Sequence, residues 1–339
     1  MTRVLYHLTV LPPALPECEA LSQEIDALRH HFGGELVYLN PNQRSLIRLP
    51  RLVFGLQKLK QLRIRETDFT LHHMNNPDPF PFPVLLGLRR PIVYTLSGGS
   101  GNKRLNTSFF SSLAAITVYD EHSQQHLRAS GLGNVHLIRS GIDTTRFTFS
   151  PTPLQSEIRL MAGSAPWTLK QFRTKGVHAL LSAAQRKSEL QLIFLWRGVL
   201  AEEMQRLVLR MGLEQQVTVI NKQVAPNEIL ANVHGCIGLA TEPTIVKAYP
   251  HSLMESLAAG KPVIVSRKIP MSHYVERMGC GQVVEQVTTS NILTAIESLA
   301  LAYDELSTAA QQVGQRDFSQ QKMIDSFASV YNDVLDRPG

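Results

Sequence analysis

Short apolar runs alternate with segments of helical spacing along the whole chain. Residues 1–140 hold six such runs, each bounded by turn residues. Segments such as ECEALSQEIDALRHHFGG, residues 17–34, separate them, with helical apolar spacing and a Gly-Gly stop. Strands that alternate with helices predict a parallel α/β sheet. The predicted strands are RVLYHLTV, ELVYLN, DFTLHH, PIVYTLS, AAITVYD and NVHLIRS.

A second series of the same kind follows a polar break. The segment FTFSPTPLQSE, residues 147–157, gathers Pro, Ser and Thr, so we expect a linker there and domains at 1–150 and 151–339. Two tandem Rossmann-like α/β domains are predicted, with a cleft at the carboxyl ends of their strands and the last helix packing back toward the first domain. The second series comprises strands IRLMAG, LQLIFLW, VTVINK, GCIGLA, PVIVS and GQVVE, and helices at 176–187, 201–212, 226–233, 252–259, about 290–312 and 316–335.

The composition is that of an ordinary globular protein. Of 339 residues, 43% are hydrophobic and 18% charged, and no apolar run reaches the roughly 18 residues that span a bilayer. The opening MTRVLYHLTVLPP is too short and too polar for a signal peptide, so we expect a cytoplasmic protein. Cys18, Cys236 and Cys280 are odd in number and lack metal-type spacing, which indicates reduced thiols.

Positive charge is concentrated in the first half of the chain. Residues 1–150 carry 16 basic and 11 acidic residues, a net +5, and the remainder carries 18 and 17, a net +1. The stretch 44–65 has no acidic residue and favours an anionic membrane surface or acceptor, with nucleic acid the weakest option because no known nucleic-acid-binding motif accompanies the charges. The commoner case is a solvated helix whose Leu49, Leu52, Val53 and Leu56 pack inward. Its basic residues are Arg44, Arg48, Arg51, Lys58, Lys60, Arg63 and Arg65.

One helix start is unusually polar. In VKAYPHSLMESLAAGKPVIV, residues 246–265, the Ser252-x-x-Glu255 spacing predicts a capping box, in which Ser252 accepts from a first-turn amide and Glu255 reaches back. Unsatisfied amides and the positive end of a helix also attract phosphate. On spacing alone, capping without any ligand is the commoner arrangement.

The second half resembles a known family. The segments TVINKQVAPNEILANVHGCIGLA and YPHSLMESLAAGKPVIVSRKIPMSHYVERMGCGQVVE resemble the donor half of the family 4 glycosyltransferases, which are retaining enzymes of GT-B fold. Three further pieces occur in the family's order: DFTLHHMNNPDPFPFP, NVHLIRSGIDTTRF and FRTKGVHALLSAA. The resemblance therefore spans nearly the whole chain and implies the GT-B fold.

The resemblance also implies a donor site. Glu255 matches the second glutamate of the family's Glu-seven residues-Glu signature, which binds ribose hydroxyls, and the amides at the helix start would receive the diphosphate. Lys247 occupies the position of the first glutamate of that signature, which in the family contacts the transferred sugar. This departure leaves the identity of the sugar undetermined. Lys247 could contact an anionic group of the sugar or simply be a surface residue. The donor-binding residues so implied are Glu255, Ser252, His251, Leu253, Pro250, Lys247, Asn221 and Arg197.

The same resemblance implies catalytic residues. Lys175 fits the family's phosphate-directed lysine, but its arginine partner falls at Ser164. Arg173 or Lys170 is expected to replace that arginine, with Arg173 preferred because its planar fork suits phosphate oxygens, unless Arg173 is only a solvated loop charge. His73 aligns with the loop histidine that approaches the sugar, although it could equally be structural. Helix dipole and basic residues are expected to neutralise the leaving group, with no metal and no cofactor.

The function so implied is transfer of a sugar from a nucleotide-sugar donor, a UDP- or GDP-sugar, to a glycan or lipid-linked acceptor in polysaccharide or glycolipid biosynthesis. The alternative is a non-catalytic protein of GT-B fold that binds a partner transferase or a glycan. The glycine-rich SGGSGNKR, residues 97–104, matches no phosphate-binding motif and is interpreted as a loop facing the acceptor.

Overall fold

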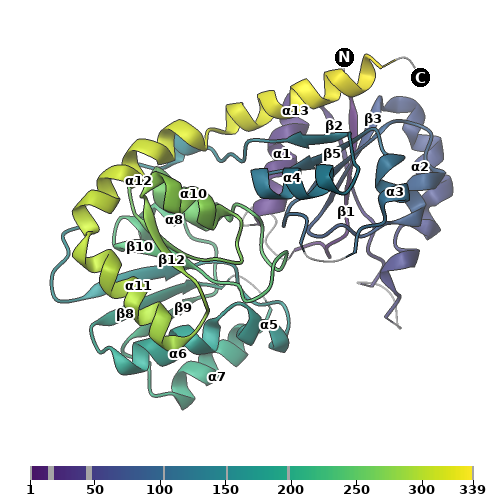
Figure 1. Cartoon of the computed structure of the whole chain (residues 1–339). Helices are drawn as coiled ribbons and strands as arrows, with labels where there is room; N and C mark the ends of the chain where they lie inside the picture. Colours follow the sequence, from purple (N-terminus) through teal and green to yellow (C-terminus); the bar gives the residue numbers. More distant parts are fainter. Residues whose placement is uncertain are drawn as a thin grey trace. The chain divides into compact units, whose positions relative to one another are not determined.

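The protein is described by a computed structural model that covers residues 2–13, 19–42, 48–101, 104–149, 152–196 and 199–337. The chain divides into two compact units (Figure 1). One comprises Met1–Ser140 with Gln321–Gly339, and the other comprises Gly141–Gln320. No helix in the described part is long and apolar enough to cross a membrane. Cys236 and Cys280 are buried free thiols, whereas Cys18 lies outside the described residues.

The first unit is built on a six-stranded parallel sheet of order β2-β1-β3-β4-β5-β6. Strands β1, β4 and β5 are buried along their whole length and are mostly apolar, whereas the equally buried β3 has the polar sequence LHHMNN. The strands are β1 (Val4–Leu8), β2 (Gly34–Tyr38), β3 (Leu71–Asn76), β4 (Ile92–Leu96), β5 (Ala115–Val118) and β6 (Val135–Leu137). The helices are α1 (Ala20–Phe32), α2 (Leu59–Arg65), α3 (Thr107–Ser111), α4 (Glu121–Ala129) and α13 (Gln320–Leu335).

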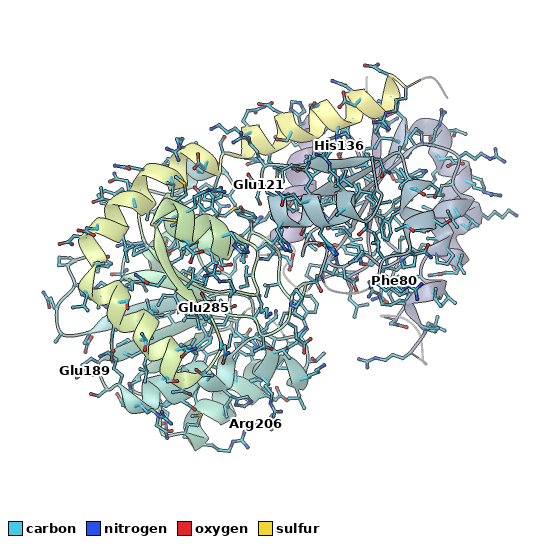
Figure 2. All side chains as sticks on the ribbon, in the orientation of Figure 1. Phe80, Glu121, His136, Glu189, Arg206 and Glu285 are labelled. Atoms are coloured by element: carbon cyan, nitrogen blue, oxygen red, sulfur yellow. The ribbon has the colours of Figure 1, made fainter. Side chains whose placement is uncertain are left out.

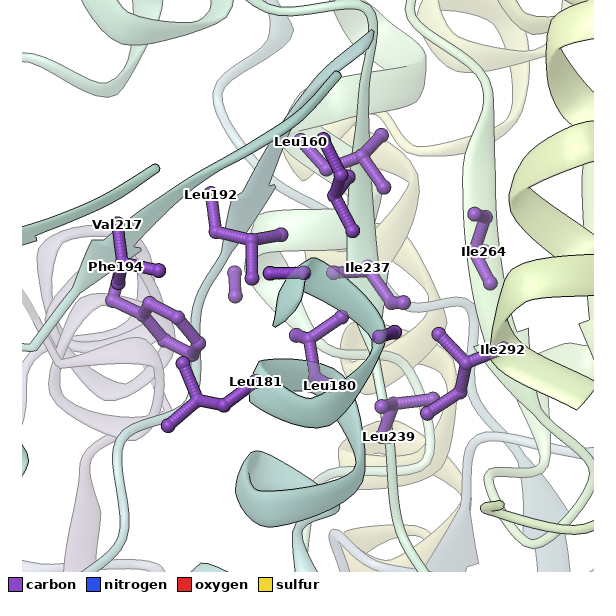
Figure 3. Packing of buried hydrophobic residues seen from close by; sticks show 14 of the residues in the cluster. Leu160, Leu180, Leu181, Leu192, Phe194, Val217, Ile237, Leu239, Ile264 and Ile292 are labelled. Carbon is purple, nitrogen blue, oxygen red and sulfur yellow. The ribbon is translucent and has the colours of Figure 1, made fainter. Parts of the chain in front are cut away.

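The second unit repeats this plan, with a parallel sheet of order β12-β11-β10-β7-β8-β9. Leu180 and Leu181 of α6 pack against apolar residues of the sheet such as Leu192 (Figure 3). The strands are β7 (Ile158–Ala162), β8 (Leu190–Leu195), β9 (Val217–Ile220), β10 (Gly235–Gly238), β11 (Val263–Ser266) and β12 (Gly281–Val284). The helices are α5 (Leu169–Thr174), α6 (Val177–Arg186), α7 (Ala201–Arg210), α8 (Pro226–Leu230), α9 (His251–Ala258), α10 (Met271–Met278), α11 (Thr289–Leu301) and α12 (Tyr303–Asp317).

The boundary expected at residue 150 lies inside the second unit. Ile142 forms a β-bridge with Ser319, and Phe147 is buried in a core of the second unit, so the chain joins that unit directly after Ser140. The polar composition of residues 147–157 predicted the linker there, but the contacts of Ile142 and Phe147 place the boundary between the two units earlier, after Ser140. At the other end of the chain, residues 321–339 belong to the first unit.

The basic stretch expected as one helix over 44–65 is broken into three short pieces. They are η2 (Arg51–Val53), η3 (Leu56–Lys58) and α2, and Gly55 between the first two has φ +81°. The inward positions were therefore wrong in part: Leu52 and Leu56 are 54% and 42% exposed, whereas Phe54 is buried. A single helical period cannot continue through a left-handed residue, so the apolar stripe is displaced. Arg44 lies outside the described residues.

Candidate functional site

The start of α9 is formed without a side-chain cap. The helix begins at His251 with Pro250 as its N-cap, and the amides of Leu253 and Met254 donate to the Pro250 carbonyl at 3.1 and 3.2 Å. The capping box expected from Ser252 and Glu255 is therefore wrong. Pro250 has φ −64° and an extended ψ of 132°, and the helix begins directly after it, so Ser252 lies inside the first turn and not at the cap. The first amides of such a helix have no acceptor within the helix, which makes this end suitable for an anion.

The loop after β7 touches this helix start. A side-chain Cβ added to Gly163 would lie 2.7 Å from both the Cβ and the Oγ of Ser252, closer than side-chain atoms pack. Glycine alone allows this approach. The contact fixes the loop that carries Ser164 and Ala165 beside the first turn of α9.

Lys175 is tied to the same loop. It ends α5, is 9% exposed, and its Nζ donates to the Ser164 carbonyl at 3.2 Å, the Ser164 Oγ at 3.1 Å and the Ala165 carbonyl at 3.0 Å. Ser164 adopts a left-handed backbone with φ +64°, which turns its carbonyl and hydroxyl to the amine. The ammonium group is thus held in the loop that lies against the start of α9.

These residues line one cavity in the second unit. Its walls include Gly163, Ser164 and Lys175 on one side, and Pro250 and Ser252 on the other. The free volume is about 30 Å³, more than the roughly 10–15 Å³ that holds one water molecule.

Lys247 lies next to the same helix start. Its Nζ is 3.4 Å from Nε2 of His251. Burial holds the pKa of His251 well below its usual value, and the charge of Lys247 lowers it further. The ring is therefore neutral, and its Nε2 accepts from the Lys247 ammonium group. A positive charge thus lies close to the positive end of α9.

Glu255 lies one turn into α9 and does not line the cavity. Glu255 is 8% exposed. Burial raises the pKa of the Cys236 thiol on β10 to about 12, and the negative charge of Glu255 contributes to this rise. Leu253 is fully buried in a core of the second unit, so only its main chain is available to a ligand. The cavity thus brings Ser252, Pro250 and Lys175 together and leaves the Glu255 carboxyl outside.

Two further expected residues of the second unit lie away from the cavity. Arg173 is exposed in the last turn of α5, and Asn221 is exposed directly after β9; neither lines the cavity. Arg197 lies outside the described residues. The sequence reasoning missed Gly163 as a site residue, although a glycine directly after a buried strand was the available signal.

His73 is buried within the first unit. Its Nδ1 is 2.7 Å from the Tyr331 hydroxyl and its Nε2 is 2.6 Å from Oγ1 of Thr95. Burial lowers the pKa of His73 to about 3, so the ring is neutral. Both ring nitrogens have partners, which leaves neither for a sugar hydroxyl in this conformation. The geometry is that of a structural histidine between β3 and α13.

Comparison with known proteins adds to this geometry. Residues 169–315 match the family model of glycosyl transferases group 1. The match runs from α5 to α12 and includes Lys175 and the whole of α9. No curated protein matches the chain.

Solved structures resemble the whole chain. Anabaena Alr3699/HepE in complex with UDP-glucose is 14% identical, with a TM-score of 0.72 over 98% of this chain and 100% of that one. Sucrose-phosphate synthase from Thermosynechococcus elongatus gives 14% identity and a TM-score of 0.72 over 98% and 99%. The lipopolysaccharide outer core galactosyltransferase WaaB gives 12% and 0.67 over 97% and 99%. Two six-stranded parallel sheets with helices match the GT-B fold, and the predicted fold class is confirmed.

Proposed function

We propose that the protein is a retaining glycosyltransferase that transfers a hexose-type sugar from a nucleotide-sugar donor. The observation that supports this most is the approach of the Gly163 loop and Lys175 to the uncapped start of α9, inside the segment that matches the glycosyl transferases group 1 model. A UDP-sugar is the donor we favour, because a structure of the same fold contains UDP-glucose. Retention of configuration rests on the resemblance to family 4.

In this proposal the start of α9 receives the diphosphate of the donor. The helix dipole and the ammonium groups of Lys175 and Lys247 stabilise the negative charge that grows on the leaving group, and neither a metal nor a cofactor is required. Lys175 exchanges its bonds to the loop carbonyls for bonds to phosphate oxygens when the donor binds. Glu255, one turn along the helix, binds the ribose.

The acceptor we propose is a glycan or a lipid-linked glycan. The protein would act in the cytoplasm, at the inner face of the membrane where such lipid-linked acceptors lie. The concentration of basic residues in the first half of the chain supports this placement.

Nucleotide binding tests the proposal directly. The thermal unfolding midpoint is measured with UDP, GDP, ADP and their sugars, since a ligand at 100 times its dissociation constant stabilises by about 2.7 kcal/mol. We expect a rise with one nucleotide series that is lost in Glu255→Ala and kept in Glu242→Ala, an exposed glutamate outside α9. If no nucleotide shifts the midpoint, the proposal is wrong. NMR of the product's anomeric proton then tests retention.

A non-catalytic protein of GT-B fold is the second candidate. The exposed position of Arg173 and the two hydrogen bonds of the His73 ring favour it, because both residues were expected at the reacting bond. An assay of the slow hydrolysis of bound nucleotide-sugar distinguishes the transferase from the non-catalytic protein. Turnover that depends on Lys175 supports the transferase, and tight binding without turnover of any donor supports the second candidate.

A further inference from the structure

The first unit exposes an apolar and basic surface on four short segments that touch one another. A Cβ on Gly55 would meet Val84 at 3.1 Å, and Leu59 of α2 closely approaches Gly87 of η5 (Pro83–Gly87). Nε of Arg63 also donates to the Gly87 carbonyl at 2.6 Å, and η2 packs against η5. The segments η2, η3, α2 and η5 therefore adjoin one another.

Large aliphatic side chains are exposed on this surface. Four of the eleven exposed large hydrophobic residues in the described part of the chain lie on it. Scattered single residues of this kind are ordinary, but four on adjoining segments indicate a contact surface. They are Leu52, Leu56, Ile64 and Leu86, which are 54%, 42%, 65% and 63% exposed.

Exposed cations lie on α2 and in the chain next to η2 and η5. We define the interfacial surface as the four aliphatic residues together with the exposed Arg48, Lys60, Arg63, Arg89 and Arg90. Most acidic residues beside it are buried or already paired. Glu66 is 3% exposed and accepts from the amide of Arg89, and Asp78 is buried. Asp68, after α2, is exposed.

Three other cations of the basic stretch have structural roles instead. Arg51 bonds Asp78 at 2.6 Å and lies 4.2 Å above the ring of Phe80, which Figure 2 labels. Lys58 donates to the Tyr38 carbonyl at 2.7 Å, and Arg65 pairs with Glu35. Neutralising these cations would therefore perturb the fold, so a test of binding must use the others.

We propose that the interfacial surface binds an anionic lipid bilayer. Aliphatic side chains enter the boundary between headgroups and acyl chains, and the exposed cations meet the anionic headgroups. Aliphatic residues suit a bilayer better than a single-stranded nucleic acid, for which exposed aromatic rings supply the stacking. The inference rests on the membrane placement in the proposed function and deepens it by naming the residues that meet the bilayer, although the contact itself needs neither donor nor acceptor.

Vesicle co-sedimentation of the full chain tests this inference. Vesicles of phosphatidylcholine with roughly a third phosphatidylglycerol are compared with pure phosphatidylcholine, without any nucleotide. We expect binding to the anionic vesicles that weakens as the salt concentration rises. A triple variant, Arg48→Gln with Lys60→Gln and Arg89→Gln, should bind on the order of 100-fold more weakly, since each cation near an anionic surface contributes about a factor of five.

Matched controls separate this surface from net charge. The variant Arg146→Gln with Arg186→Gln and Arg210→Gln removes the same charge from exposed sites of the second unit, and it should bind like wild type. The inference is overturned if both triple variants bind alike, or if wild type binds neither kind of vesicle.

An apolar pair provides a second test. Ile64→Ser with Leu86→Ser should weaken binding roughly tenfold, because less apolar area enters the bilayer. Leu209→Ser with Leu301→Ser, whose side chains are 63% and 90% exposed on the second unit, is its control. Equal binding by the two pairs would mean that these aliphatic residues do not enter the bilayer, against the proposal. Because no nucleotide is present, failure here leaves the proposed sugar transfer standing and removes only its placement at the membrane.

Discussion

The close approach of Gly163 to Ser252 gives the sharpest test of the candidate site. In Gly163→Ala the new Cβ would lie 2.7 Å from two atoms of Ser252, about 1 Å inside an ordinary carbon contact. Its φ is outside the left-handed region, so the effect is steric rather than conformational. Extra volume of this kind costs about 1–3 kcal/mol, which corresponds to roughly 5- to 150-fold in nucleotide affinity if the loop moves off α9.

The measurement is calorimetric titration of each variant with the nucleotide that binds wild type. Ser252→Gly removes both clashing atoms, so the double variant Gly163→Ala with Ser252→Gly should regain most of the affinity that Gly163→Ala loses. Ser252→Gly alone reports the cost of a glycine in the first turn of α9. The reasoning fails if Gly163→Ala binds like wild type, or if the double variant binds no better than Gly163→Ala.

Three further predictions concern single buried groups. Lys175→Met should weaken nucleotide binding at least tenfold by titration calorimetry, whereas Arg173→Met, at an exposed site, should leave it unchanged. The pKa of His73 is about 3 in the folded protein and 6.5 in the unfolded chain, so below pH 6.5 the unfolded state alone binds a proton and the folded state loses stability. Between pH 8 and pH 5, the free energy of unfolding in urea should fall by about 2 kcal/mol more in wild type than in His73→Gln. Burial lowers the pKa of Lys261 to about 8, so Lys261→Met should raise the thermal midpoint at pH 7, by an amount that shrinks at pH 10; a larger difference at pH 10 would contradict this.

The fold was predictable because both sheets are parallel and covered on both faces. Most of the central strands are then largely apolar runs, with the polar β3 (LHHMNN) as an exception, and the helices between them keep their spacing. The helix expected at 201–212 is observed at Ala201–Arg210, and the one expected at 176–187 at Val177–Arg186. Such patterns depend only on local sequence and on burial, so the order of elements follows from them.

The details of the site depended on contacts that spacing cannot reveal. The hydrogen bond between His73 and Tyr331 joins residues 258 positions apart, and it converts an expected ligand of the sugar into a structural residue. Helix α9 begins at His251, directly after Pro250, so Ser252 lies inside its first turn and forms no capping box. In both places a tertiary or backbone constraint overrode a motif that local sequence made plausible.

Lys247 shows how a departure from a family pattern acquires a physical meaning. By resemblance alone, Lys247 only marks the loss of the glutamate that the family has at this position. In the structure its ammonium group lies 3.4 Å from the His251 ring and helps to keep the pKa of that ring low. A glutamate there would favour protonation of His251 and would place a negative charge near the first amides of α9. The lysine instead adds positive potential to a helix start that no side chain caps, so this departure strengthens the site as a place for an anion.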